Sequence, residues 1–305
     1  PTTNIYDEFI ERMVVKHQFN RSQLEQLLNS SKLQKSILKA MSSPAEKCVA
    51  WHSYRNIFLK PNRINGGVAF WQKNKATLEA ASIKYGVPEE IIVAIIGVET
   101  RYGSNTGSYK VLDSLTTLGF HFPKRARFFK SELEHFLLLC REEGFDPSQP
   151  KGSYAGAMGK SQFISSSYRA YAVDGDADGK RDLWNSNADI INSIAYYFAK
   201  HGWKKDLLIT QKTSLTGSSF KSVLNTSLKP KHTLKQLKSA SVKVPKGLDP
   251  NTPVKLLELK QADHSDYWLA FNNFYVITRY NHSHLYAMAV YQLAQEIKEN
   301  YLKTP

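Results

Sequence analysis

The sequence predicts a mainly α-helical protein of the α+β class, with a small β-rich lobe inserted late in the chain. Three observations indicate this. Apolar residues from Ile5 to about Lys84 recur at helical spacing, a purely apolar run follows at 91–98, and beyond Trp203 the apolar runs shorten to strand length. With 305 residues, the chain is long enough to bury a large core and to form two or three domains.

The first predicted domain covers residues 1–88 and is helical, and the C-terminal helix 283–305 is expected to complete it. Residues 59–67 read LKPNRINGG, and Pro61 with two glycines predicts a loop between helices. The C-terminal helix follows Ser283, whose short hydroxyl side chain favours the N-cap position.

The second predicted domain, residues 89–203, begins with the helix that contains the apolar run. Pro88 suits the start of a helix, and the two glutamates after it complement the positive end of the helix dipole. A further helix is predicted from about Lys124 to Glu143, where Gly144 ends it.

The third predicted domain, residues 204–282, is a small basic lobe with strands such as 241–245 and 254–259. From Lys204 to Lys260 the sequence has 12 lysines and no arginine, against three acids, and the whole chain carries a net charge of +14. Lysines suit loose attraction to an anionic polymer better than base recognition, which uses arginine. We therefore expect the lobe to hold the protein near an acidic polymer, with a merely solubilising surface as the alternative.

Composition excludes several classes of protein. A chain with 42% hydrophobic and 22% charged residues is globular and not disordered. Its longest apolar run is far shorter than the ~20 residues that a membrane span needs. Cys48 and Cys140 form neither a disulfide framework nor a metal motif, and we expect them to be unpaired. Because the chain starts at Pro1, without methionine or leader, we expect a trimmed form whose signal or lipid anchor lay upstream.

Glu99, at the C-terminal end of the apolar helix, is the strongest candidate for a catalytic residue. A helix that is apolar on all sides is buried, so its last side chain is expected to be partly desolvated. Desolvation and the negative end of the helix dipole both disfavour a carboxylate and raise its pKa. Such a group keeps a proton near neutral pH and can donate it. A salt bridge with Arg101 is the alternative, and it would lower the pKa instead.

The segment DGDADGKRD, residues 174–182, has the alternating aspartates of a calcium-binding loop. Carboxylates packed so closely repel one another unless a cation neutralises them, so we predict one structural Ca²⁺ ion here. The departure from the pattern is Asn185 at position 12, where a bidentate glutamate is usual. A bare acidic turn is the alternative. Loop positions 1, 3, 5, 6, 7 and 9 are occupied by Asp174, Asp176, Asp178, Gly179, Lys180 (through its backbone carbonyl) and Asp182.

Four segments of the chain resemble the lytic murein transglycosylase B family. In order, they are GVETRYG (97–103), SYAGAMGKSQF (153–163), YAVDGDADGKRDLW (171–184) and YNHSHLYAMAV (280–290). The resemblance extends from about Trp51 to Leu293, most of the chain. It implies a lysozyme-like helical core and an enzyme that cuts the glycan strands of peptidoglycan.

The resemblance also implies roles for individual residues. Glu99 matches the family's single catalytic acid/base, and Asp189 is the candidate for the aspartate that closes the calcium loop, which then covers residues 174–189. Tyr280 and Asn281 are expected at a strand-to-helix junction. Residues matching positions that bind sugar or support the site are Tyr54, Arg125, Ser153, Met158, Gln162, Phe163, Tyr197, Tyr280, Asn281 and Tyr286. Aromatic rings and amides suit a sugar, which has an apolar face and a hydroxyl rim. For the tyrosines, ordinary core packing is the alternative.

Most glycosidases use two carboxylates, and a second one is not evident here. Asp113 belongs to no motif, and a group of four glutamates is predicted on a solvated helix face: Glu132, Glu134, Glu142 and Glu143. The family needs one acid only, because the N-acetyl group of the substrate assists and the product is a 1,6-anhydromuramyl end. A muramidase that hydrolyses the same bond, a non-catalytic wall-binding protein and a lysine-rich nucleic-acid binder remain the alternatives.

The resemblance further implies the setting in which the protein works. Its partner would be the glycan strands of peptidoglycan, and other cell-wall enzymes are further candidate partners. No nucleic acid is expected, and the protein is expected to be a monomer. It would act in the periplasm, as a soluble form or held at the outer membrane by a lipid-modified segment upstream.

Overall fold

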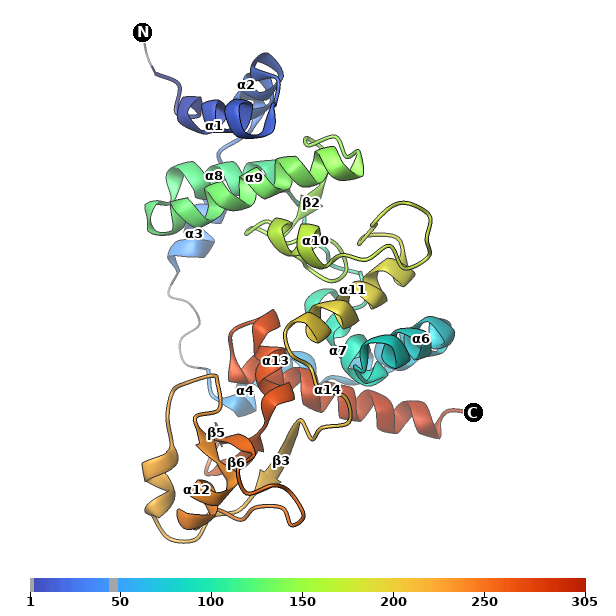
Figure 1. The fold of residues 1–305 in the computed structure, drawn as a ribbon, viewed down its shortest axis with the longest axis vertical. Helices are drawn as coiled ribbons and strands as arrows, with labels where there is room; N and C mark the ends of the chain where they lie inside the picture. Colours follow the sequence, from blue (N-terminus) through green and yellow to red (C-terminus); the bar gives the residue numbers. More distant parts are fainter. Residues whose placement is uncertain (1–2, 44–48) are drawn as a thin grey trace. The chain divides into compact units, whose positions relative to one another are not determined.

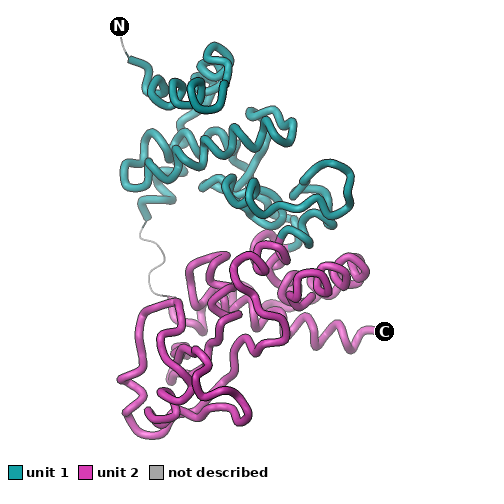
Figure 2. The backbone as a smooth tube through the Cα atoms, viewed as in Figure 1, with its two compact units in different colours: residues 1–47, 102–193 teal, residues 48–101, 194–305 magenta. Residues whose placement is uncertain are grey.

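The computed structural model describes residues 3–43 and 49–305. Within them helices dominate, and the strands form a two-stranded and a four-stranded sheet (Figure 1). The chain divides into two compact units, each made of two segments (Figure 2). Unit 1 is residues 1–47 with 102–193, and unit 2 is residues 48–101 with 194–305. The predicted mainly helical fold with a small β lobe is confirmed, whereas the predicted division into three domains stays a prediction.

Unit 1 is built on two long helices, α8 (Val111–His121) and α9 (Ala126–Glu143), which pack against each other. As predicted, α9 ends at Gly144, which takes the left-handed conformation (φ 72°) that favours glycine. The unit's other elements are α1 (Asp7–His17), α2 (Arg21–Ser30), α3 (Lys35–Ser42), β1 (Tyr109–Lys110), the 3-10 helix η1 (Pro123–Arg125), β2 (Lys151–Gly152) and α10 (Ser165–Tyr171). β1 and β2 are antiparallel.

Unit 2 is organised around α7 (Glu89–Thr100), whose residues Ile91 to Gly97 are all buried. It packs against α5 (Pro61–Lys73), α6 (Lys75–Tyr85) and α14 (His284–Lys303). Because α7 is apolar on all sides, it can be stable only where neighbours cover most of its surface. α4 (Trp51–Phe58) and α13 (Asn272–Tyr280) also pack on α14. The boundary between the units falls within α11 (Asn187–Lys200).

The β lobe of unit 2 contains the four-stranded antiparallel sheet, in the order β3–β6–β5–β4. Its strands are β3 (Thr210–Thr213), β4 (His232–Thr233), β5 (Pro253–Lys260) and β6 (Ser265–Ala270). The lobe also has the 3-10 helix η2 (Ser219–Val223) and a short helix, α12 (Leu234–Ser239). Its core includes Leu237, Val254 and Leu269, each fully buried. The predicted strand 254–259 is confirmed, whereas 241–245 forms only an isolated bridge between Val242 and Leu215.

The predicted loop at 59–67 is wrong, because this segment runs into α5. Pro61 occupies the start of the helix, where its missing N–H costs no hydrogen bond. The two following glycines lie inside the helix, at a cost of about 1 kcal/mol each relative to alanine. Packing of α5 on α7 and α14 outweighs that cost.

Cys48 lies outside the described residues, so its pairing stays a prediction. Cys140 is a buried free thiol on α9, and desolvation raises its pKa to about 12, which makes it inert. Within the described residues, no helix is both long enough and apolar enough to cross a bilayer.

Candidate active site

Glu99 lies in the last turn of α7, where the buried helix places its carboxyl group among protein atoms. Desolvation raises its pKa to about 7, and a hydrogen bond from Tyr286 opposes the increase. Among the described residues, no salt bridge involves Glu99, so the Arg101 alternative does not hold. Arg101 instead ends the helix in the left-handed conformation, with φ 50°. The predicted upward shift of the Glu99 pKa thus has its expected cause.

Tyr286 is the hydrogen-bond partner of Glu99. Its hydroxyl donates to Glu99 Oε1 at 2.6 Å. Ser283 caps α14, as predicted, by accepting from the Tyr286 backbone N–H at 3.2 Å. Desolvation and the nearby Glu99 charge hold the pKa of Tyr286 well above its usual value, so the phenol keeps its proton. The sequence indicated Tyr286 as a substrate-binding residue, and its bond to Glu99 was missed because no local signal links residues 187 positions apart.

Three further tyrosines of unit 2 form a cluster with Tyr286. Tyr54 and Tyr280 both interact electrostatically with Tyr286. The Tyr280 ring lies edge-on to that of Tyr197, with centroids 5.0 Å apart. The Tyr197 hydroxyl donates to the Arg279 carbonyl at 2.7 Å, which fastens the end of α13. Tyr197 therefore supports the tyrosine cluster and has its hydroxyl proton committed to that bond.

Asn281 follows α13 directly and is exposed. The predicted strand-to-helix junction at Tyr280–Asn281 is wrong, because α13 precedes it and α14 begins at His284. The β-branched run of Val276, Ile277 and Thr278 favours a strand locally, yet the segment packs as a helix against α14. The junction is thus a tight connection between two helices, with one amide side chain exposed.

Ser153 and Gln162 lie in the loop after β2, in unit 1. The Ser153 hydroxyl oxygen accepts from two backbone N–H groups, those of Ala155 at 3.2 Å and Ala157 at 3.0 Å. The Gln162 side-chain amide donates to the Thr106 and Gly159 carbonyls, and its backbone has φ 54°. A non-glycine residue in this conformation is uncommon and strained. Both side chains therefore fix the loop, while the Ser153 O–H and the Gln162 carbonyl keep hydrogen-bonding capacity.

Met158 and Phe163 are buried, with exposures of 0% and 2%. Their backbones pair in an antiparallel bridge, with bonds of 2.8 and 3.1 Å. Gly152 adjoins the same bridge, and a Cβ there would lie 2.2 Å from the Ala157 carbonyl oxygen, so only glycine fits. The structure thus places both side chains in the core under the loop, and their predicted contact with substrate stays a prediction.

Arg125 ends η1 and is exposed. Its guanidinium lies over two rings, 4.4 Å from the Phe128 centroid and 5.2 Å from that of Phe129. Cation–π contacts hold the side chain in place and leave N–H donors for an anionic ligand. Within the described residues, the structure does not bring Arg125 into contact with Ser153 or Gln162.

The candidates for a second carboxylate are engaged elsewhere in unit 1. The predicted solvated face of α9 is wrong for Glu132 and Glu134, which are 4% and 9% exposed. Glu134 accepts from His17 at 2.7 Å and pairs with Arg12, and Glu132 accepts from the Ser166 backbone N–H at 3.1 Å. They are buried because α1 and α10 provide partners that the helical pattern alone does not reveal.

Two further acids are also structural. Glu143 pairs with Arg181 at 2.6 Å. Asp113 is 5% exposed and accepts from the Lys32 backbone N–H at 2.9 Å. Each of these carboxylates stabilises a contact inside unit 1. Of the candidate acids, Glu99 is therefore the one whose desolvated carboxyl group keeps a proton near neutral pH.

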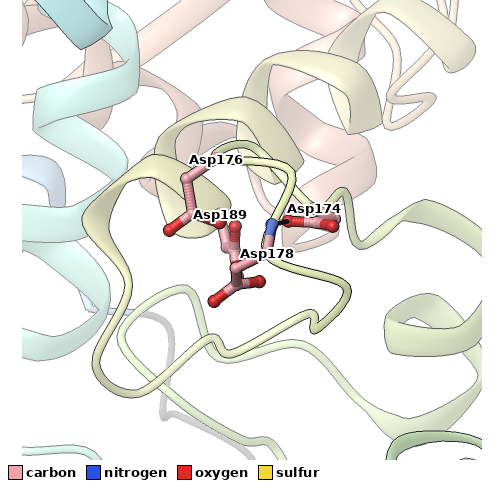
Figure 3. Close-up of side chains that lie close together, drawn as sticks. All are labelled: Asp174, Asp176, Asp178 and Asp189. Carbon is pink, nitrogen blue, oxygen red and sulfur yellow. Dashed lines mark hydrogen bonds between the residues drawn. The ribbon is translucent and has the colours of Figure 1, made fainter.

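Four aspartates of residues 174–189 lie close together (Figure 3). Carboxylate oxygens of Asp174, Asp176, Asp178 and Asp189 all lie within 4.8 Å of one another. Asp189 comes from the first turn of α11 and is fully buried, where its oxygens accept from the Gly175 and Asp182 N–H groups at 2.7 and 2.8 Å. A set of hard oxygen donors at this spacing fits Ca²⁺.

Gly179, Lys180 and Asp182 complete the loop in different ways. Gly179 makes the sharp turn with φ 87°. Lys180 is exposed, and its N–H donates to Asp178 Oδ1 at 2.9 Å. Asp182 is not one of the four clustered carboxylates, and its Oδ1 accepts from the backbone N–H of Trp184 at 2.9 Å. Its place at position 9 of the calcium loop stays a prediction.

The fold and site define a family, and the chain belongs to it: residues 2–295 match the transglycosylase SLT domain. The resemblance found in the sequence is thereby confirmed. The chain is 42% identical over 299 residues to membrane-bound lytic murein transglycosylase B of Escherichia coli (strain K12), covering 95% of this chain and 81% of that protein.

Two solved structures show the same fold. The catenated lytic transglycosylase SltB1 from Pseudomonas aeruginosa has a TM-score of 0.95 and 44% identity, covering 98% of each chain. The Escherichia coli lytic transglycosylase Slt35 in complex with calcium has a TM-score of 0.90 and 42% identity, covering 99% of this chain and 95% of that one.

Proposed function

We propose that this lytic transglycosylase cuts the β-1,4 bond between N-acetylmuramic acid and N-acetylglucosamine with Glu99 as its single acid/base. The enzyme cleaves peptidoglycan and leaves a 1,6-anhydromuramyl end, the activity of its family. The observation that carries the assignment is the desolvated Glu99 carboxyl, with its pKa of about 7. Such a group is divided between its acid and its carboxylate near neutral pH, so one residue can perform both steps.

The reaction proceeds in two steps through this carboxyl group. Glu99 donates its proton to the glycosidic oxygen, the bond to the muramyl C1 breaks, and the substrate's N-acetyl oxygen bonds to C1. The Glu99 carboxylate then takes the proton of the muramyl 6-hydroxyl, whose oxygen attacks C1 and releases the acetamido group. The first proton leaves with the released sugar and that of the 6-hydroxyl restores Glu99 to its acid form, so no water is consumed and the product carries an anhydro ring.

The remaining site residues supply binding and positioning. Tyr286 orients the Glu99 carboxyl through its hydrogen bond. Tyr54, Tyr197, Tyr280 and Asn281 contribute aromatic faces and an amide from unit 2. Arg125, Ser153 and Gln162 are proposed to offer polar groups to sugar, and Met158 and Phe163 to shape the loop that carries Ser153 and Gln162. Their chemistry suits a sugar, which presents an apolar face and hydroxyls.

We further propose one structural Ca²⁺ ion held by Asp174, Asp176, Asp178 and Asp189, with the Lys180 carbonyl as a fifth oxygen ligand. The clustering of four carboxylates supports this, as does the solved relative that contains calcium. Bound calcium would neutralise charges that otherwise repel and would join the loop to α11. These residues have no part in the proton transfers.

The proposal includes the setting of the reaction. Peptidoglycan strands are the substrate, and we place the enzyme in the periplasm because its substrate lies there. A monomer that works beside other cell-wall enzymes is what we expect, and the related E. coli protein is membrane-bound by name.

Digestion of purified sacculi in heavy-oxygen water tests the reaction. We expect muramyl ends that are 1,6-anhydro sugars and contain no heavy oxygen, measured by mass spectrometry. Incorporation of heavy oxygen at the new muramyl end would identify a muramidase. Binding without any cleavage would identify a wall-binding protein, and both results would overturn the proposal.

A further inference from the structure

The β lobe contains a hollow of about 1190 Å³ in which none of the proposed catalytic residues lies. Its lining comes from residues 214–251, mainly from α12 and the segment that follows it (orange in Figure 1). We call this hollow the lysine pocket. Its lining residues are Ser214, Thr216, Leu234, Lys235, Lys238, residues 241–248, Pro250 and Asn251.

Four lysines line the pocket, and all four are exposed. Lys235 and Lys238 lie three positions apart on α12, which places them on one face of the helix, and Lys243 and Lys246 come from the next segment. No acidic residue lines the pocket. Among the described residues, none of the four ammonium groups takes part in a salt bridge. Four like charges around one hollow repel one another, and an anionic ligand would relieve that repulsion.

The same pocket has apolar walls. Leu234 and Val242 are each 2% exposed and belong to the lobe's core, while Leu248 is a large apolar side chain that is 40% exposed. Pro245 and Pro250 add rigid apolar surface without N–H donors. A ligand that fits must therefore carry anionic groups together with small apolar groups.

A second hollow, of about 530 Å³, borders the same chain segment. It shares Ser214 and residues 243–246 with the lysine pocket and adds Lys212 of β3. Both hollows border the same lysine-bearing segment. A ligand that fills both would have to be an extended chain and not a single small ion.

We propose that the lysine pocket binds the acidic peptide stem of peptidoglycan, an inference that rests on the proposed function. The stem is a short peptide in which carboxylates outnumber amines and alanine methyl groups lie between them. Lysine ammonium groups suit scattered carboxylates, and the methyl groups suit the Leu, Val and Pro surface. No arginine lines the pocket, and arginine is the residue that recognises phosphate by paired hydrogen bonds. Stem binding there would hold the enzyme on the wall at a point other than the cleaved bond.

The test compares two variants with the same change in charge. The pocket variant carries Lys235→Gln, Lys238→Gln, Lys243→Gln and Lys246→Gln. The control variant carries Lys221→Gln, Lys229→Gln, Lys231→Gln and Lys260→Gln, exposed lysines of the same lobe that do not line the pocket. Both are made in the full chain with Glu99→Gln, so that binding is measured without cleavage. The probe is the free tetrapeptide L-Ala-γ-D-Glu-diaminopimelate-D-Ala, titrated by NMR and calorimetry.

Relative to the parent Glu99→Gln protein, we expect the pocket variant to bind the tetrapeptide about tenfold more weakly. The control variant should lose less than about twofold in affinity. Equal weakening in both variants would mean diffuse attraction and would overturn the proposal, as would a parent protein that fails to bind the tetrapeptide. Tighter binding of inorganic polyphosphate than of the tetrapeptide in the same pocket would overturn it in favour of a phosphorylated polymer. If the fourfold variant does not fold, two double variants replace the fourfold ones. The double pocket variant carries Lys243→Gln and Lys246→Gln, and its control carries Lys229→Gln and Lys231→Gln.

The proposed function is tested separately from this site. Cleavage of peptide-free glycan strands by the enzyme with Glu99 intact reports on the reaction without any stem. Anhydro products there, together with normal tetrapeptide binding by the pocket variant, would overturn the stem site alone.

Discussion

The hydroxyl of Tyr286 lies 2.6 Å from Oε1 of Glu99, joining the first turn of α14 to the last turn of α7. Two opposed effects act on Glu99: desolvation favours the neutral acid, and the donated hydrogen bond favours the carboxylate. Desolvation is the larger, and the pKa of Glu99 comes to about 7. The pair therefore keeps both protonation states within reach near neutral pH.

Glu99→Gln should abolish most of the activity. The amide cannot supply or take the proton, and general acid–base catalysis contributes about 10²–10⁴ in rate. The fold should survive, because the amide is neutral like the acid it replaces. Release of anhydromuropeptides from sacculi measures the loss, and circular dichroism verifies the fold. Glu90→Gln, in the first turn of the same helix, is the matched control and should retain its rate; a rate for Glu99→Gln within tenfold of it would contradict the assignment.

Tyr286→Phe should change the pH dependence of the reaction. Without the donated hydrogen bond the Glu99 carboxylate is less stable, so its pKa rises and the acid keeps its proton to higher pH. A hydrogen bond to a charged group is worth about 1.5–3 kcal/mol, so the basic limb of kcat/KM should move upward by about one pH unit. Tyr291→Phe, on the same helix, should leave the profile in place. A Tyr286→Phe enzyme that is slower at every pH with an unmoved profile would reduce Tyr286 to a packing role.

The contribution of Glu99 to the stability of the fold should decrease as pH rises from 4.5 to about 7. The pKa of Glu99 is raised from 4.5 in the unfolded chain to about 7 in the fold, so the folded state binds more protons between these values. Its contribution is fully present below pH 4.5 and is lost as pH rises through 7, by up to about 3 kcal/mol.

Urea unfolding of the wild type and Glu99→Gln at pH 5 and pH 8.5 measures this contribution. Glu99→Gln lacks the titrating group. The difference between its free energy of unfolding and that of the wild type should therefore shift in favour of the variant between pH 5 and pH 8.5. A constant difference between the two proteins at both pH values would show that the carboxyl group ionises in the fold as it does in the unfolded chain.

Calcium should raise the melting temperature of the protein by mass action, because the four aspartates converge only in the folded state. Asp189→Asn should remove most of this increase, since it takes one buried carboxylate from the cluster. Asp206→Asn, an exposed site outside the cluster, is the isosteric control. Melting curves with calcium and with chelator, together with calorimetric titration, give the readout. Superimposable curves and no calorimetric heat would rule the ion out.

Local signals in the sequence determined the helical class of the protein and the position of its principal acid. Residues 91–98 have no polar side chain, so their helix has to be buried and its last carboxyl group desolvated. Gly144 ends α9 because a residue without a Cβ takes the left-handed conformation easily, and Ser283 caps α14 through its hydroxyl group. These features depend on neighbours within a few positions, and a sequence displays such neighbours directly.

Only the tertiary structure decided the partners of those residues. Tyr286 meets Glu99 across 187 positions, and Asp189 joins the aspartate loop because α11 starts where that loop ends. Residues 61–73 form a helix despite two glycines, and Glu134 is buried because α1 supplies His17 and Arg12. All of these contacts join distant segments and exist only once the chain has folded; for α5 they outweigh the cost of about 1 kcal/mol for each glycine.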